Sequence, residues 1–296
     1  MKKSTKITLT ITALIVSFVF LLLLGGSFVV HKAVIEPLDK NLTYIQTMKG
    51  FITGNADGKG EKQLKDSSMW ENHHHISIYY EENFSELLPL TKETLDLAIE
   101  RNEELFGETD PVPVDLLVYE NFVEMNGFKL REAKDAYYSD FQKIIAIHNS
   151  GKEVLLAEDE LALYNFRLVL LHEYTHYAFY QRVSNANHYP MWFIEGVAEY
   201  AGTDPERVYN PHFQTIPFAE LNSTVQWETA LTTQLTSPYL QSYYALAFLT
   251  AEYGEEVIAQ LIDSVDESRN FEESFLEVTG LTLSELENVF LNSYKD

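Results

Sequence analysis

The longest apolar run of the chain lies close to its beginning. No charged residue occurs between positions 7 and 30, and positions 11–24 are apolar except for one threonine and one serine. A run of this length is sufficient to cross a bilayer as a single helix. The pattern therefore predicts one transmembrane helix.

The charges around this run predict its orientation. Three lysines lie within the first six residues, whereas His31 and Lys32 are the only basic residues close behind the run. Because positive residues are retained on the cytoplasmic side, residues 1–30 are expected to form a cytoplasmic tip and a signal-anchor. The remainder then lies outside a single-pass cell membrane protein.

A cleaved signal peptide is the alternative, and it would yield a secreted protein. The apolar run exceeds the roughly 7–15 residues of a signal-peptide core, and no A-x-A-like cleavage site follows it. These two features favour the uncleaved anchor.

Residues 31–70 then lose the apolar pattern, with Gly, Asn, Asp and Lys crowded into 54–62. This composition predicts a stalk and flexible linker.

Alternation of apolar and polar residues predicts a strand over 72–80. His73, His74 and His75 are adjacent here and raise the possibility of a metal site. Successive side chains of a strand point to opposite faces. We therefore interpret the three histidines as polar residues at a strand entrance.

The rest of the pattern predicts an α+β fold, in which strands and one long helix precede a mainly helical half. A capping-box pattern at Thr282 and Glu285 marks the last helix. The expected strands are 114–119 and 141–148, and the expected helices are 91–106, 160–182, 191–202, 238–253 and one that follows Thr282.

The amino-acid composition excludes several classes of partner and of functional site. In 296 residues, 21 Lys and Arg stand against 45 Asp and Glu, which gives a net charge of −24. This charge argues against a nucleic-acid partner and against strongly anionic substrates. The absence of cysteine excludes disulfides, Cys-ligated zinc and thiol catalysis. His and carboxylate side chains remain as the strong metal ligands.

One such set lies in the predicted helix 160–182, in the sequence LLHEYTHYAFY. His172 and His176 are four residues apart and share one face of a helix, so both imidazoles can bind one Zn2+. Glu173 is offset around the helix and is predicted to act as the general base toward water. If instead both histidines were core residues, each would need a hydrogen-bond partner.

The sequence PMWFIEGVAEY supplies the missing carboxylates. Glu195 follows His176 after eighteen intervening residues and is predicted to be the third metal ligand. Glu199, one helical turn further on, can accept the N–H of a ligating histidine. A ligand set of two histidines and one carboxylate leaves a fourth position open, as catalytic zinc sites do.

This spacing resembles the gluzincins, the thermolysin and aminopeptidase N group of zinc metallopeptidases, and most closely the peptidase-MA-like domains. The metzincin pattern does not fit, because Phe179 and Arg182 stand where it requires Gly and His. The resemblance implies a zincin fold for a metallopeptidase domain at 71–296. Such a fold has a mixed, mainly antiparallel sheet with an edge strand, an active-site helix and a helical C-terminal part.

The resemblance also suggests how substrates are bound. It implies a Tyr or His that donates to the developing oxyanion, with Tyr239 at the matching position and Tyr243 as second choice. No GAMEN-type motif, which reads a free N-terminus in aminopeptidase N relatives, precedes His172. The strand at 144–147 is expected to pair with an extended peptide as an edge strand.

The expected function is a membrane-anchored extracytoplasmic zinc peptidase acting as an endopeptidase on peptide or protein substrates. Two alternatives stay open. One is a non-catalytic, membrane-tethered module of the same fold that binds peptide or cell-wall ligands. The other is the hydrolysis of a non-peptide amide.

Overall fold

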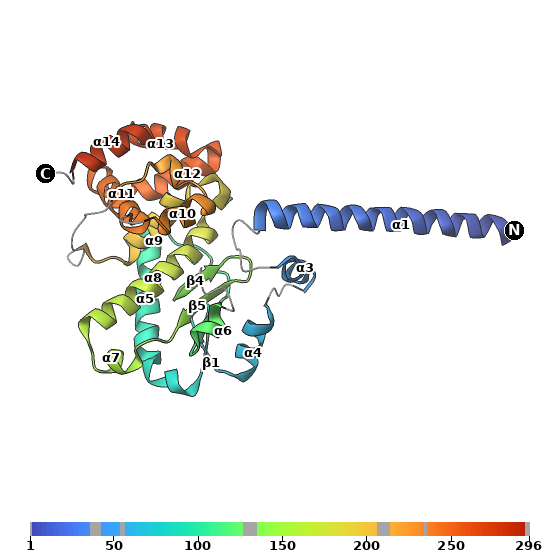
Figure 1. Cartoon of the computed structure of the whole chain (residues 1–296), viewed down its shortest axis with the longest axis horizontal. Coiled ribbons are helices and arrows are strands. Elements are labelled where there is room, and N and C mark those ends of the chain that lie inside the picture. Colours follow the sequence, from blue (N-terminus) through green and yellow to red (C-terminus); the bar gives the residue numbers. More distant parts are fainter. Residues whose placement is uncertain are drawn as a thin grey trace. The chain divides into compact units, whose positions relative to one another are not determined.

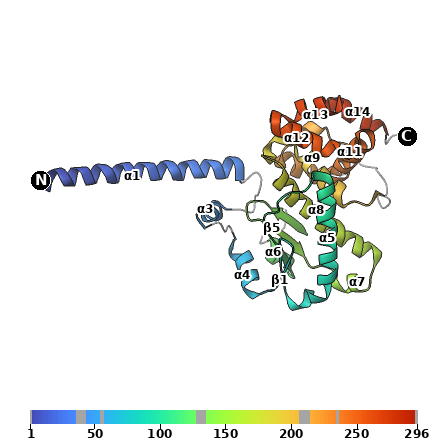
Figure 2. The ribbon, with the colours of Figure 1, turned by 180° about the vertical axis from the view of Figure 1, so that it is seen from behind.

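The structure is a computed structural model that describes residues 2–35, 43–53, 57–126, 135–205, 214–233 and 236–293. The chain divides into two compact units, Met1–Lys59 and Gly60–Asp296, called here the N-terminal and C-terminal units. Figures 1 and 2 show the ribbon from opposite sides.

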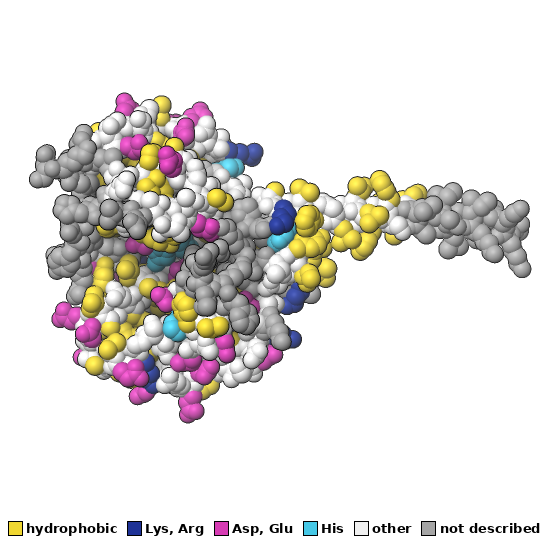
Figure 3. All heavy atoms as spheres, in the orientation of Figure 1, with side chains coloured by type: hydrophobic (Ala, Val, Ile, Leu, Met, Phe, Trp, Pro, Cys, Tyr) yellow, Lys and Arg dark blue, Asp and Glu magenta, His cyan; other side chains and the backbone are white. Residues whose placement is uncertain are grey.

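The described part of the N-terminal unit is mainly helical. Helix α1 (Lys2–Val30) continues into the π-helical segment η1 (His31–Ile35), and α3 spans Tyr44–Thr53. Among the described residues, Ile15–Ala33 is a helical segment long and apolar enough to cross a membrane, with a mean hydropathy of 2.0. Hydrophobic side chains cover the described part of α1 (Figure 3).

The stretch expected to be a flexible linker is more regular than its composition suggests. Helix α4 (Lys59–Ser67) packs on the sheet of the C-terminal unit through Leu64, and Lys65 Nζ lies 2.6 Å from Asp115 Oδ2. One apolar residue and one ion pair therefore anchor a segment in which Gly and Lys obscure any apolar pattern. Residues 36–42 and 54–56 of the expected stalk and linker, 31–70, lie outside the described residues.

The C-terminal unit contains a five-stranded mixed sheet of order β1-β2-β3-β5-β4. The pairs β1–β2 and β4–β5 are antiparallel, whereas β2–β3 and β3–β5 are parallel. The expectation of a mainly antiparallel sheet is therefore wrong. Parallel neighbours need a crossover connection, which helix α5 provides between β2 and β3. The strands are β1 (Met69–His73), β2 (Ile76–Tyr80), β3 (Val114–Tyr119), β4 (Ala136–Ser139) and β5 (Ile144–His148).

The strand at 144–147 is not an edge strand, contrary to expectation. It lies within β5, which pairs with β3 on one side and β4 on the other. The edge is formed by β4, a strand of four residues, AYYS. So short a segment shows no clear apolar alternation, and the sequence pattern could not predict it.

Helices cover both faces of the sheet. The side chains of Ile78, Leu116 and Ile145 face a core shared with α5 (Leu88–Phe106) and α8 (Glu160–Arg182). On the opposite face, Leu117 and Ala146 pack with α4 and α6. In Figure 1, α5 and α8 pass beside the strands. The remaining short helices are η2 (Glu82–Leu87), α6 (Phe122–Asn126), α7 (Lys152–Leu156), η3 (Ala186–His188) and η5 (Phe218–Glu220).

The second half of the C-terminal unit is helical and has its own apolar core. Aliphatic and aromatic residues share this core, and Trp192, Phe193 and Phe271 pack edge to face or tilted against one another. The pattern predicted α8, α9, α11 and α14 but not α10, α12 or α13. The helices after α8 are α9 (Met191–Gly202), α10 (Thr224–Leu231), α11 (Pro238–Tyr253), α12 (Val257–Ser268), α13 (Phe271–Thr279) and α14 (Leu283–Ser293).

Candidate metal and catalytic site

Helix α8 carries the HExxH residues. At its start, the Asp159 side chain accepts a hydrogen bond from the Ala162 backbone N–H at 2.9 Å. The negative charge of Asp159 also interacts favourably with the helix dipole. The helix continues without a break to Arg182. His172 and His176 consequently lie one turn apart on the same face.

The structure brings the three predicted metal ligands together. The Nε2 atoms of His172 and His176 are 3.0 Å apart, and each lies 3.4 Å from Glu195 Oε2. Glu195 is 6% exposed and is therefore almost completely removed from water. Three ligand atoms from two helices thus converge on one point.

Helix α9 holds Glu195 in place because it packs closely on α11. A Cβ atom at Gly196 would lie 3.0 Å from the backbone oxygen of Ser242 and 2.6 Å from Leu246 Cδ2. Any larger residue would require Leu246 and the backbone of α11 near Ser242 to shift. The glycine next to the ligand therefore allows the approach that positions the ligand.

Glu199 fixes the tautomer of His172. Its Oε1 atom lies 3.1 Å from His172 Nδ1. When Nδ1–H donates to this carboxylate and the imidazole is neutral, the lone pair of Nε2 is directed toward Glu195 and His176. This is the carboxylate–histidine arrangement typical of metal-ligating imidazoles.

The pKa shifts of Glu195 and His172 indicate that a positive charge stabilises this cluster. Burial alone would raise the pKa of Glu195, but the imidazoles of His176 and His172 hold it well below its ordinary value. Burial alone would lower the pKa of His172, yet Glu195 and Glu199 raise it well above its ordinary value. A buried anionic cluster of this kind is stabilised by a positive charge, from either a proton or a metal ion.

The donor set fits Zn2+ in both chemistry and size. Two imidazole nitrogens and one carboxylate oxygen are the ligands of catalytic zinc sites. Ligand atoms about 2.0–2.1 Å from one zinc ion at the corners of a tetrahedron are about 3.3 Å apart. The distances of 3.0 and 3.4 Å between the three atoms lie close to that value.

Glu173 lies beside this set but outside it. The three residues whose ligand atoms group together are His172, His176 and Glu195. Glu173 is buried, and its charge acts on both His172 and Tyr239. A buried carboxylate next to the metal ligands can accept a proton from a water molecule.

Of the two predicted tyrosines, Tyr239 lies at the site. Its ring centroid is 6.1 Å from that of His172, and it packs edge-on against Trp227 at 5.1 Å. Burial and the carboxylate of Glu195 raise the pKa of Tyr239 well above its ordinary value, so the phenol stays protonated and can donate. Tyr243 instead packs with Tyr200 and Tyr244.

The sequence analysis missed Trp227, which supports Tyr239. It lies in α10 and is 3% exposed. A tryptophan in an amphipathic segment is usually a core residue, so no feature of the sequence distinguished it. Its position follows only from the packing of α10 against α11.

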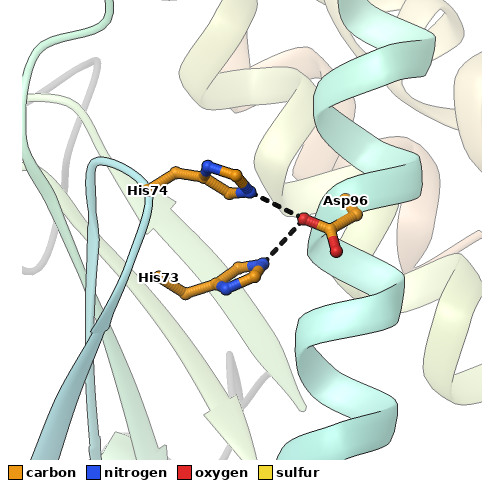
Figure 4. Close-up of side chains that lie close together, drawn as sticks. All are labelled: His73, His74 and Asp96. Atoms are coloured by element: carbon orange, nitrogen blue, oxygen red, sulfur yellow. Dashed lines mark hydrogen bonds and ion pairs between the residues drawn. The ribbon is translucent and has the colours of Figure 1, made fainter.

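A second histidine cluster lies on the hairpin β1–β2, where the expectation from strand geometry proves wrong. His73 Nε2 and His74 Nε2 lie 2.7 and 2.8 Å from the same oxygen, Asp96 Oδ1 on α5 (Figure 4). The two side chains converge because His74 lies in the turn with φ of 53°, outside the strand. The left-handed backbone breaks the alternation that would have separated them.

Comparisons with known proteins give the family. The profile of the Peptidase MA superfamily matches residues 94–296, about two thirds of the chain, and the chain belongs to this superfamily. The protein is 29% identical to "Uncharacterized protein YhcO" of Bacillus subtilis (strain 168) over 270 residues, which cover 90% of this chain and 83% of the relative.

A solved structure shares the fold. The protein is similar to an aminopeptidase A of Legionella pneumophila, crystallised in complex with aspartic acid, with a TM-score of 0.52 and 14% identity. The match covers 76% of this chain but only 27% of the aminopeptidase. The chain thus corresponds to about a quarter of that enzyme.

Proposed function

We propose that the protein is a zinc-dependent endopeptidase of the gluzincin type, anchored in the cell membrane with its C-terminal unit outside. The observation that carries this proposal is the convergence of His172, His176 and Glu195, with Glu173 beside them. Membership of the Peptidase MA superfamily supports the peptidase class.

His172, His176 and Glu195 are the residues that hold the metal. A bound zinc ion supplies Lewis-acid polarisation of the peptide carbonyl and makes a water molecule more acidic. Glu173 accepts the proton of the attacking water and returns it to the nitrogen of the leaving amine. Tyr239 donates its phenolic hydrogen to the developing oxyanion.

The edge strand β4 is the proposed support for the substrate backbone. Among the described strands, β4 pairs only with β5, so no described strand occupies its outer edge. Helix α8 packs next to it, through Tyr177 and Tyr180 against Tyr138. An extended peptide added to this edge would lie along the helix that carries the HExxH residues.

The proposal of an endopeptidase rests on the sequence. The aminopeptidase of Legionella shares the fold, but no GAMEN-type motif precedes His172 in this chain. We therefore expect peptides with blocked termini to be cleaved. Hydrolysis restricted to substrates with a free N-terminal amine would instead assign the protein to the aminopeptidases.

The decisive experiment uses Glu173→Gln in the full chain purified in detergent. We expect the variant to retain wild-type zinc content and to lose about 10²–10⁴-fold in the rate of cleavage of an unfolded polypeptide, because it lacks the proton acceptor. Zinc is measured by mass spectrometry, and wild-type cleavage is expected to stop with chelator and return with Zn2+.

The control is Glu252→Gln, an exposed glutamate on α11. Cleavage by Glu173→Gln at the wild-type rate would remove Glu173 from the mechanism. A zinc-loaded wild-type chain that cleaves no polypeptide would instead favour the non-catalytic binding module. Turnover of small amides but not of peptides would favour the remaining alternative.

A further inference from the structure

The cluster of His73, His74 and Asp96 has the composition of a metal site. Two imidazole nitrogens and one carboxylate oxygen lie within 4.8 Å of one another. They come from the tip of the hairpin β1–β2 and from α5, as Figure 4 shows. This is the same donor set as at the first site, on different elements.

We propose that His73, His74 and Asp96 form a second site that binds a transition-metal ion such as Zn2+. Imidazole ligands suit Zn2+, Cu2+ and Ni2+ better than Mg2+ or Ca2+, which prefer oxygen ligands. Three protein ligands leave the remaining positions to water. The site is independent of the peptidase proposal, since none of its residues belongs to the first site.

The backbone arranges the two histidines for a shared ligand. His73 ends β1, where it pairs with Ile76, and His74 follows with φ of 53° in the turn. A left-handed conformation is uncommon for a residue other than glycine. Here it places two consecutive imidazoles with ring centroids 4.4 Å apart, both directed at Asp96.

The exposure of the cluster allows a metal ion to enter. The side chains of His74 and Asp96 are 56% and 53% exposed, whereas that of His73 is 18% exposed. Small rotations of the two exposed side chains can widen the N–O distances of 2.7 and 2.8 Å to those between ligands of one ion. The same exposure predicts weaker binding than at the buried first site.

His75 does not belong to the set, although it is adjacent in sequence. Its Nε2 atom lies 3.2 Å from the hydroxyl oxygen of Tyr174, and its ring stacks on Tyr177 at 5.5 Å. The side chain of His75 therefore packs on the face of α8 that carries these tyrosines. His74 and His75 both line a cavity of about 420 Å3, which also includes Asn102 and Glu103 of α5.

A metal ion at this site would link the hairpin tip to α5. The link would hold one wall of the cavity in place, because His74 is both a ligand and a lining residue. Because a ligand that binds only the folded state stabilises it by mass action, zinc should raise the melting temperature of the chain through this site.

The test counts zinc ions in the full chain, purified in detergent without a histidine tag. A His172→Ala/His176→Ala variant removes the first site, and we expect it to bind one Zn2+ per chain and to melt at a higher temperature with zinc. Adding His73→Ala/His74→Ala should abolish both effects. Should the first variant fail to fold, the wild-type chain should bind two ions and the His73→Ala/His74→Ala chain one.

Two matched variants separate metal binding from hydrogen bonding. Asp96→Asn keeps an oxygen acceptor for the histidines but is a poor metal ligand, so zinc binding at this site should fall at least tenfold. His188→Ala, a partly exposed histidine away from the hairpin, should bind as the parent chain does. An unchanged zinc count and affinity in His73→Ala/His74→Ala, or in Asp96→Asn, would overturn the proposal and leave a hydrogen-bonded turn.

Discussion

Tyr239 is the residue whose role depends most on its surroundings. Its ring contacts both His172 and Trp227, and burial together with nearby carboxylates keeps the phenol protonated. Tyr243, on the next turn of α11, faces Tyr200 instead. The orientation of α11 therefore distinguishes two tyrosines that the sequence left as first and second choices.

Replacement of Tyr239 by Phe should remove the oxyanion donor while keeping the packing of the ring. We expect kcat to fall about 10²–10³-fold, the typical effect of losing one such donor. KM and zinc content should change little, because the hydroxyl is needed only in the transition state. The measurement is steady-state kinetics on a blocked, internally quenched peptide.

Tyr243→Phe is the matched control for this experiment. Burial raises the pKa of Tyr243 to about 12, so it too is a protonated phenol, but its ring packs with Tyr200 and Tyr244. The Tyr243→Phe chain should keep the wild-type kcat. If Tyr243→Phe loses activity and Tyr239→Phe does not, the assignment of the two tyrosines is reversed.

Glu199 contacts His172, one of the proposed metal ligands. Loss of its charge in Glu199→Gln weakens the hydrogen bond that orients the imidazole, now 3.1 Å from Nδ1 to Oε1. We expect zinc affinity to fall about 10–100-fold, as for other carboxylates that support a ligating histidine. Competition with a zinc chelator of known affinity gives this constant, with Glu252→Gln as control. An affinity equal to that of the control would show that Glu199 only contributes to packing.

At the scale of elements, the contact between α9 and α11 sets the geometry of the site. Gly196 in α9 approaches the backbone of Ser242 so closely that even a methyl group requires a shift. Trp192, Phe193 and Val197 on the same helix are buried in the apolar core. The position of Glu195 thus depends on a well-packed helix pair rather than on a loop.

Gly196→Ala should therefore destabilise the protein and disturb the site together. We expect the free energy of unfolding to fall by about 1–3 kcal/mol, the usual cost of overpacking, and zinc affinity to decrease as α9 moves. Chemical denaturation of the full chain measures the first effect and zinc competition the second.

Gly60→Ala provides the control, since nothing lies within 4 Å of a Cβ atom at that position in α4. Alanine favours a helix over glycine by up to about 1 kcal/mol, so this variant should be equally or slightly more stable. A Gly196→Ala chain as stable as the wild type would mean that α9 and α11 are not held at this distance.

The success of the sequence-based predictions varies with the range of the interactions involved. Helices α8 and α9 and the last helix follow from local signals: Asp159 accepts from Ala162, and Thr282 and Glu285 form the predicted cap. The spacing from His172 to Glu195 suggested their proximity, which the structure shows. Each of these signals lies within a few residues or in a motif of fixed length.

Features that depend on long-range pairing could not be predicted. Strand β4 lies at the edge of the sheet because it pairs with β5. Helix α4 is anchored through Leu64 and Lys65 on strands that are distant in the sequence. The convergence of His73 and His74 required a turn whose position no local signal indicated. In each case, partners far away in the sequence, or one unusual backbone angle, outweigh local propensity.

At the scale of the whole molecule, charge and hydrophobicity are strongly separated along the chain. The described part of α1 is almost wholly apolar, whereas acidic side chains are spread over the visible face of the C-terminal unit (Figure 3). The whole chain has a net charge of −24, which disfavours strongly anionic partners. The apolar helix and the acidic C-terminal unit support the proposed membrane-anchored peptidase.

The orientation of that attachment is testable through the first three lysines. Lys2, Lys3 and Lys6 should keep the N-terminus in the cytoplasm. The triple Lys→Glu variant should therefore reduce the fraction of chains whose C-terminal unit is digested by protease added outside intact spheroplasts. The triple Lys→Arg variant, which conserves the charge, should behave as the wild type.

Wild-type chains should resist carbonate extraction and keep their intact mass. Release of a shortened chain into the medium would instead identify a cleaved signal peptide, since an anchor that retains residues 1–30 cannot leave the bilayer without exposing its apolar surface to water.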